Sequence, residues 1–163
     1  MSAIKTSDWT GNDNYFEDFE TGAVYRHARG KTIEAIDNVQ ITNLVLNTAQ
    51  AHFNEDAMRD NPMFDQRVSF GGVTIALVVG LAMQDTGEQA LAELGLDKIR
   101  LKAPVFHGDS LYAYSQVLAL EAAERDDAGI VGFHHWGVNQ DDVVVFEGDR
   151  RVLLKRRSHW AGR

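Results

Sequence analysis

A near-apolar run in the middle of the chain limits the folds that this sequence can adopt. The run covers residues 73–83, follows Gly71-Gly72, and carries apolar side chains on every side instead of on one face. It is too short to cross a bilayer, so we expect it in the interior of a folded domain. Its length and its continuation through residues 88–96 favour a helix that is buried all round. One small sheet cannot cover such a helix, and a second subunit is the simplest source of the remaining cover.

The composition of the chain is that of an ordinary globular domain. The chain has 163 residues, of which 44% are hydrophobic and 25% are charged, a mixture typical of globular proteins. Acidic residues outnumber basic ones by 24 to 16, for a formal net charge of −8. This balance argues against nucleic acid or an anionic membrane as the main partner. Cysteine is absent, which excludes disulfides, zinc–thiolate sites and Cys nucleophiles. Residues 1–8 carry no signal-peptide pattern, and we expect a cytoplasmic protein.

The order of the predicted elements indicates an α+β fold. Residues 23–33 are expected to form a strand. Residues 34–51 lack Gly and Pro, and Ile41, Leu44 and Val45 have helical spacing, which predicts a helix. Alternating apolar residues and short turns predict an antiparallel meander after the long helix, with strands over residues 99–105, 111–118, 130–138 and 143–154. This order fits an antiparallel sheet wrapped round the long central helix.

The chain is expected to form one domain, because no repeat, low-complexity segment or proline-rich linker divides it. The domain is predicted over residues 15–157. A flexible N-terminal tail is predicted over residues 1–14, which are polar and end in a loop signal, and a C-terminal tail over residues 158–163. Lys155-Arg156-Arg157 forms a short basic cluster. This cluster either is a solvated end or pairs with the phosphates of a nucleotide-like handle.

The first candidate site segment, residues 47–54, follows the predicted helix. His52 stands there among amides, where a rigid element can hold a loop side chain. An imidazole titrates near neutral pH, so His52 is a candidate general base, with Asn47 on the same segment. The alternative is a structural role, in which His52 caps the helix and Asn47 and Gln50 satisfy backbone groups of the loop.

The second candidate segment is Ser69-Phe70-Gly71-Gly72, directly before the long helix. The first N–H groups of a helix have no partner within it and lie at the positive end of its dipole. Ser69, Gly71 and Gly72 are therefore candidates for binding an oxyanion or a phosphate. The alternative is that both glycines only permit a tight turn or close packing. No Gly-Lys-Ser/Thr follows, so this is not a nucleotide phosphate loop.

The other histidines give weaker signals. His107 stands beside the turn residues Gly108-Asp109 and is expected to be solvated. His134-His135 lies in a predicted strand, where neighbouring side chains point to opposite faces and cannot bind one metal ion together. No metal-binding motif is present, and we expect no metal.

Together, these segments resemble the MaoC-like dehydratases, a hot-dog fold family that includes the (R)-specific enoyl-CoA hydratases. The most distinctive segment is Ala103-Pro104-Val105 with Gly108-Asp109-Ser110-Leu111, which is similar to the family's Pro-Val-x-x-Gly-Asp-Thr-Leu hairpin. The aromatic opening at residues 15–19 with Gly22, and the stretch over residues 30–37, are also similar to family patterns. The resemblance covers about residues 15–157.

The resemblance implies a hydro-lyase that adds water to an enoyl-CoA or a related acyl thioester. His52 matches the family His, and Gly71 matches the glycine whose N–H polarises the thioester carbonyl. The implied partners are the acyl-CoA substrate and at least one further copy of the chain, as a homodimer or a higher oligomer. No cofactor other than the CoA thioester itself is implied.

Asn47 departs from the family pattern, which has Asp at this position. Without that carboxylate His52 is the only titrating catalyst. This leaves a catalytically silent acyl-CoA-binding protein open as an alternative, and hot-dog folds also host thioesterases. Residues 47–53 are similar to a stretch in hydratases for branched dicarboxylic thioesters, such as mesaconyl-CoA and β-methylmalyl-CoA. A carboxylate on the substrate would be repelled by Asp, but not by an amide.

Overall fold

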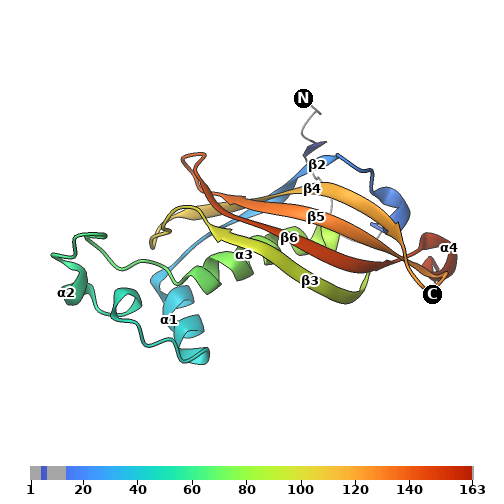
Figure 1. The fold of residues 1–163 in the computed structure, drawn as a ribbon. Helices are drawn as coiled ribbons and strands as arrows, with labels where there is room; N and C mark the ends of the chain where they lie inside the picture. The colour runs from blue at the N-terminus through green and yellow to red at the C-terminus, as the bar shows by residue number, and fades with distance from the viewer. Residues whose placement is uncertain (1–4, 7–13, 163) are drawn as a thin grey trace.

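The computed structural model describes residues 5–6 and 14–162 (Figure 1). The strands are β1 (Lys5–Thr6), β2 (Val24–Thr32), β3 (Ala90–Leu101), β4 (Ser110–Ala122), β5 (Ala128–Val138) and β6 (Val144–Lys155). The α-helices are α1 (Ala35–Leu44), α2 (Glu55–Met58), α3 (Gly71–Thr86) and α4 (Arg157–Trp160), and the 3-10 turns are η1 (Phe16–Asp18) and η2 (Gln50–His52). No helix in these ranges has the length and apolar character that a membrane span requires.

The strands form one sheet in the order β1-β2-β4-β5-β6-β3. All neighbours are antiparallel except β1 and β2, which are parallel. The sheet curves round α3, which runs along its concave face (Figure 1). The predicted α+β class, with an antiparallel sheet round a long central helix, is thereby confirmed. The meander holds for β4, β5 and β6, whereas β3 pairs with β6 at the far edge and not with β4.

The prediction that the long helix continues through residues 88–96 is wrong. Helix α3 ends at Thr86, and the N–H of the next residue, Gly87, donates to the carbonyl of Met83. The following residues belong to β3, where Glu93 pairs with Val152 of β6. The apolar character of this stretch suits a strand as well as a helix, and pairing with β6 decides between them. The strand predicted over residues 99–105 therefore starts earlier and ends at Leu101.

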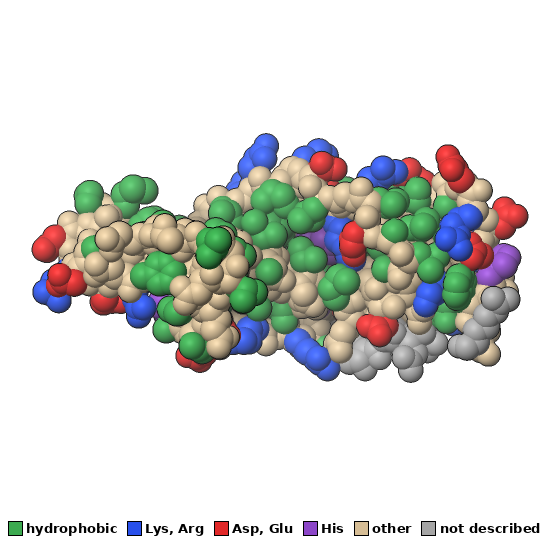
Figure 2. Space-filling view, turned by 90° about the horizontal axis from the view of Figure 1, so that it is seen from below, with side chains coloured by type: hydrophobic (Ala, Val, Ile, Leu, Met, Phe, Trp, Pro, Cys, Tyr) green, Lys and Arg blue, Asp and Glu red, His purple; other side chains and the backbone are tan. Residues whose placement is uncertain are grey.

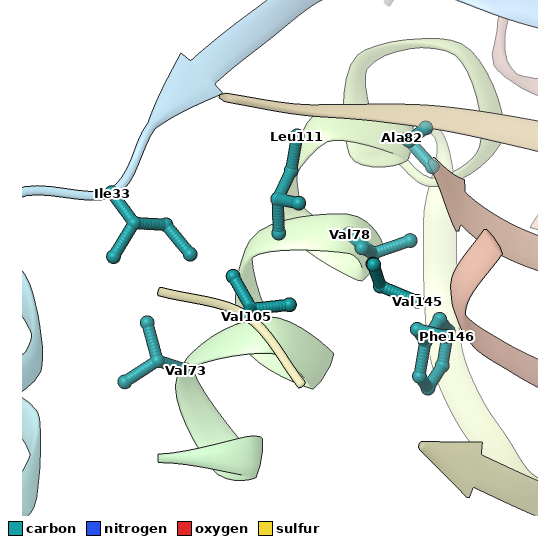
Figure 3. Close-up of a cluster of buried hydrophobic side chains, with 9 residues drawn as sticks. Ile33, Val73, Val78, Ala82, Val105, Leu111, Val145 and Phe146 are labelled. Carbon is teal, nitrogen blue, oxygen red and sulfur yellow. The ribbon is translucent and has the colours of Figure 1, made fainter. Parts of the chain in front are cut away.

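One face of α3 packs against the sheet, and the other does not. Val73, Val78 and Ala82 are completely buried in a cluster with Ile33, Leu111 and Phe146 (Figure 3). Ala76 and Gly80, on the opposite face, are exposed. Within one chain α3 is therefore not buried all round, which agrees with the expectation that one sheet cannot cover it. The apolar character of the exposed face has no partner among the residues that the structure describes.

The approach of α3 to the sheet depends on Gly137 of β5. A Cβ atom at this position would lie 2.4 Å from Cγ2 of Val78. That side chain is fully buried and, being β-branched, has little rotamer freedom. Gly132, on the same strand, has room, because the nearest atoms to its Cβ position are 3.8 Å away.

We expect Gly137→Ala to lower the free energy of unfolding by about 1–3 kcal/mol, the usual cost of an extra methyl group in a packed core. The matched control, Gly132→Ala, should leave the midpoint of urea denaturation close to that of the wild type. Equal midpoints for the two variants would show that Gly137 does not set the distance between α3 and the sheet.

The two histidines of β5 lie on opposite faces, as predicted. His134 Nδ1 contacts Asp149 Oδ1 at 2.6 Å, whereas His135 is buried and its Nδ1 lies 2.6 Å from Ser115 Oγ. Ser115 Oγ also lies 2.6 Å from Nε2 of the buried His27. Burial lowers the pKa of His135 well below its usual range, and the positive charge of Arg150 adds to this effect. His135 is therefore a neutral core residue at neutral pH.

The predicted tails are described only in part. Most of residues 1–14 lies outside the described residues, but Lys5–Thr6 form β1 beside β2. In the predicted C-terminal tail, residues 158–160 belong to α4. The aromatic opening packs against the domain, since Tyr15 and Phe19 are buried.

Candidate active site

The lobe that carries α1, η2 and α2 projects beyond one end of the sheet (Figure 1). It lies next to the N-terminal end of α3, and Val68 just before α3 forms a bridge with Phe106. The two candidate site segments of the sequence therefore come together at this end. Their contacts are mediated by His52, Asn38 and the backbone of residues 68–70.

His52 is held so that one ring nitrogen is available for chemistry. Its Nδ1 lies 2.8 Å from the carbonyl oxygen of Val68. A carbonyl only accepts hydrogen bonds, so Nδ1 carries the proton and Nε2 of the neutral ring keeps its lone pair. The half-buried ring also packs against Phe70, with ring centroids 5.6 Å apart. This arrangement is suited to a general base that acts through Nε2.

Asn38 connects the two site segments and was missed by sequence reasoning. It is completely buried on α1. Its Nδ2 donates to the carbonyl oxygen of His52 at 3.0 Å, and its Oδ1 accepts from the N–H of Phe70 at 2.8 Å. One amide thus joins the His52 turn to the residue that precedes α3. An Asn in a predicted helix gives no signal for such a role, because a polar residue is normally placed on the solvent face.

Helix α1 buries two polar side chains and leaves apolar side chains exposed at its C-terminal end. Its buried residues are Asn38 and Thr42, whereas Leu44 is 86% exposed, Val45 55% and Leu46 84%. The helix predicted over residues 34–51 from the spacing of Ile41, Leu44 and Val45 exists, but it ends at Leu44. Leu44 and Val45 nevertheless point away from the core, whereas Ile41 packs against it.

Asn47 stabilises its own turn. Its Oδ1 accepts from the N–H of Ala49 at 3.1 Å, and its backbone N–H donates to the carbonyl of Thr42 at 2.9 Å. The preceding residue, Leu46, has φ of 57°, in the left-handed region that reverses the chain after α1. The structural role considered for Asn47 is therefore present. Its side chain is only half-buried, so a water or a ligand can still reach it.

Ser69 lines a pocket at the start of α3. It is 4% exposed, and no described residue forms a hydrogen bond with its Oγ. The pocket has a volume of about 290 Å³, and Gly71, Thr74, Leu101 and Pro104 also line it. A buried hydroxyl without a partner is costly, and Ser69 lines the same pocket as Gly71, the first residue of the 16-residue helix α3. The hydroxyl and the helix N-terminus are together suited to a carbonyl oxygen or an anion.

Gly71 and Gly72 both lie close to neighbouring side chains. A Cβ on Gly71 would lie 2.4 Å from Leu101 Cδ1, and one on Gly72 would lie 2.3 Å from Phe70 Cε1. These contacts favour the packing alternative for the glycines. It is compatible with a binding role, because the same packing leaves the N–H groups of the first helical turn without partners in the helix.

His107 is not solvated as predicted. It is half-buried, and its buried Nε2 has no hydrogen-bond partner among the described residues. Burial is the main cause that lowers the pKa of His107, and the nearby Arg67 cation lowers it further. His107 is adjacent to Phe106, whose ring packs on Phe64 with centroids 6.0 Å apart.

The basic cluster of residues 155–157 lies with α4 at the end of the molecule opposite the α1–α2 lobe (Figure 1). Arg156 stacks over Phe16 with its guanidinium 4.4 Å from the ring centroid, and Arg157 pairs with Asp18 at 2.5 Å. These cations fix the aromatic opening to the end of β6, and they are remote from His52. Among residues 5–6 and 14–162, no three His, Asp or Glu side chains gather into a metal site.

Known proteins similar to this chain act on CoA thioesters. The family model described as mesaconyl-CoA hydratase matches residues 5–156. A mesaconyl-CoA hydratase of Haloarcula marismortui is 35% identical over 153 residues, covering 87% of this chain and 42% of that protein. A beta-methylmalyl-CoA dehydratase of Chloroflexus aurantiacus is 31% identical over 163 residues, covering 90% of this chain and 46% of that protein.

The solved structures include a MaoC domain protein dehydratase from Chloroflexus aurantiacus. It matches with a TM-score of 0.82 at 30% identity, over 90% of this chain and 46% of that chain. The present chain therefore spans less than half the length of these relatives.

Proposed function

We propose a function for this chain from the premise that it belongs to the mesaconyl-CoA hydratase family and has the hot-dog fold of the MaoC-like dehydratases. The chain is a hydro-lyase that hydrates an enoyl-CoA thioester, with mesaconyl-CoA as the favoured substrate. The observation that carries the proposal is the hydrogen bond from His52 Nδ1 to Val68, which leaves Nε2 unprotonated in the neutral ring. The position of His52 beside Ser69 and the start of α3 supplies the second part of a hydratase site.

In the proposed reaction, His52 Nε2 removes a proton from a water molecule. The water oxygen bonds to the β-carbon of the substrate, and the electron pair of the double bond moves through the α-carbon to the thioester carbonyl oxygen. The resulting enolate then takes a proton at the α-carbon from the His52 imidazolium. Atoms balance as one water added across one double bond, and His52 returns to its neutral form.

The negative charge on the thioester oxygen needs hydrogen-bond donors. In our proposal these are the Gly71 N–H, at about 3 Å from the oxygen, and the Ser69 hydroxyl, with Gly72 allowing Phe70 to pack beside the site. The positive end of the α3 dipole adds to this stabilisation. A complex in which the carbonyl points away from the Gly71-Gly72 turn would contradict the assignment.

The dicarboxylic substrate is favoured over a plain enoyl thioester by the relatives and by Asn47. An amide at this position holds a water without adding negative charge, whereas a carboxylate would repel a second carboxylate on the substrate. A purified-protein assay should therefore show faster hydration of mesaconyl-CoA than of crotonyl-CoA, followed by the absorbance of the enoyl thioester.

The same assay separates the other candidate functions. Release of free thiol from an acyl-CoA would identify a thioesterase. Binding of acyl-CoA without change in either signal would identify a silent acyl-CoA-binding protein. Either result would contradict the hydratase proposal.

Asn47→Asp tests the proposed basis of substrate choice. We expect kcat/KM for mesaconyl-CoA to fall by about tenfold, the effect of about 1.4 kcal/mol of added repulsion, while kcat/KM for crotonyl-CoA is unchanged or rises. The measurement compares both specificity constants for the wild type and the variant. A uniform rise of kcat/KM for both substrates would show instead that Asn47 only lowers the activity that the family Asp supports.

We further propose that the chain works as a homodimer or a higher oligomer. The exposed face of α3 and the edge strand β3 border a groove of about 620 Å³, lined mainly by apolar residues such as Ile75, Val79, Met83 and Leu94. Hydrophobic side chains gather across this side of the molecule (Figure 2). A second copy would cover this face and pair with the free edge of β3. Sedimentation that finds only an 18.2 kDa species at micromolar concentration would exclude this assembly.

A further inference from the structure

We propose that Asn38 is a positioning residue that couples the catalytic base to the oxyanion site. This inference rests on the proposed function and extends it to a residue outside the candidate site segments. The buried amide of Asn38 bonds at once to the His52 carbonyl and to the Phe70 N–H. Phe70 is the N-cap of α3, and Gly71 is its first residue. Asn38 therefore fixes the distance between the group that takes the proton and the groups that hold the oxyanion.

The chemistry of the two partners determines which side chain fits. The His52 carbonyl only accepts a hydrogen bond, and the Phe70 N–H only donates one. The side chain between them must present a donor on one side and an acceptor on the other, within the reach of a short side chain. An amide does both without a charge, which matters because Asn38 is completely buried. An ionised carboxylate would place an oxygen against the His52 carbonyl oxygen.

Thr42 provides a matched comparison on the same helix. It is also completely buried, but among the described residues its hydroxyl bonds only to the carbonyls of Asn38 and Val39, within α1 itself. If burial of polar groups on α1 served only the stability of the lobe, Asn38 and Thr42 would behave alike. The side-chain contacts of Asn38 with two separate site segments distinguish it from Thr42.

The test compares Asn38→Ala, Asn38→Asp and Thr42→Val in the full chain, with mesaconyl-CoA as substrate. Asn38→Ala should lower kcat by about 10²-fold, because an error of about 1 Å in the placement of reacting groups has an effect of this size. Its KM should change much less than its kcat. Thr42→Val should retain the wild-type kcat. Equal losses in Asn38→Ala and Thr42→Val would overturn the proposal.

Asn38→Asp gives a pH signature that a purely structural role would not produce. In its protonated form the new carboxyl group can donate to the His52 carbonyl, and in its ionised form it cannot. The ratio of variant to wild-type kcat should therefore rise as the pH falls. A ratio that is independent of pH would contradict the proposed hydrogen bond.

A double-mutant cycle with His52→Ala locates the effect. If Asn38 acts through His52, Asn38→Ala should cause little further loss of kcat in the His52→Ala background. An equal loss in both backgrounds would mean that Asn38 does not act through the base.

A readout without substrate separates this inference from the proposed function. Nitrogen-15 NMR of the imidazoles should show His52 protonated at Nδ1 in the wild type and a mixture of tautomers in Asn38→Ala. An unchanged His52 tautomer in Asn38→Ala would overturn the positioning role, even if the wild type is an active hydratase. An inactive wild type with the expected tautomer shift would instead overturn the hydratase function alone.

Discussion

His52→Ala should lower kcat for mesaconyl-CoA hydration by about 10²–10⁴-fold, the usual contribution of a positioned general base. The physical reason is that no other titratable group belongs to the candidate site segments, since Asn47 carries no charge. The folded state should lose little, because His52 is half-buried and contributes one side-chain hydrogen bond, to Val68, worth about 1 kcal/mol. Steady-state kinetics and thermal denaturation on the same preparation measure both quantities.

Two controls sharpen this prediction. His52→Gln can still donate a hydrogen bond toward Val68 but offers no base, so it should be as inactive as His52→Ala. His159→Ala removes an exposed imidazole on α4, at the opposite end of the molecule, and should be fully active. Near-wild-type turnover in either His52 variant would remove His52 from the mechanism.

Glu93→Ala should lower the free energy of unfolding by about 3 kcal/mol, at the lower end of the range for breaking a buried ion pair. Arg150 is 1% exposed, and its Nε donates to Glu93 Oε2 at 2.9 Å while Nη2 donates to Glu93 Oε1. Its remaining side-chain bond is from Nη1 to the neutral Thr86 hydroxyl, at 2.9 Å. Removal of Glu93 leaves a buried guanidinium without an anion. The lower end of the range applies because Glu93 itself is 52% exposed.

The adjacent residue of β6 offers a matched control. Arg151 pairs with Glu121 on the surface, where both side chains are about half exposed, and such pairs contribute about 0–1 kcal/mol. Glu121→Ala should therefore have little effect on the urea midpoint. Combining Glu93→Ala with Arg150→Met should recover part of the loss, because the second change removes the unpaired charge. Equal effects of Glu93→Ala and Glu121→Ala on the urea midpoint would show that burial of Arg150 does not increase the contribution of its ion pair to stability.

The periodicity of the sequence predicted the main elements because each has a clear local signal. The alternation in residues 111–118 agrees with β4, and the all-round apolar run at residues 73–83 lies within α3. Local signals do not determine which strands pair. Residues 88–96 are apolar enough for a helix, yet they form part of β3, because β6 offers a free edge there. Pairing between distant strands is a property of the whole chain and not of a window.

In the candidate site, too, the sequence predicted the residues that have a clear local signal. His52 and Ser69 carry chemistry in their side chains, and a glycine pair before a helix is recognisable as a possible anion site. The structure brings these segments together, although their roles stay predictions. Asn38 gave no signal, because its importance depends on two backbone groups that are 14 and 32 residues away. A hydrogen bond to a backbone group does not depend on the side chain of the partner residue, so the type of that residue gives no signal for the bond.

The reversed polarity of α1 has a practical consequence for protein engineering. A rule that makes surfaces more polar and interiors more apolar would change Leu44, Leu46 and Asn38. The first two changes should be tolerated by the folded chain, since these side chains are more than four-fifths exposed. Replacing Asn38 by an apolar residue would leave both of its backbone partners without a hydrogen bond. Solubilising substitutions and labels therefore belong at residues 44 and 46, at the end of α1 and in the turn that follows it.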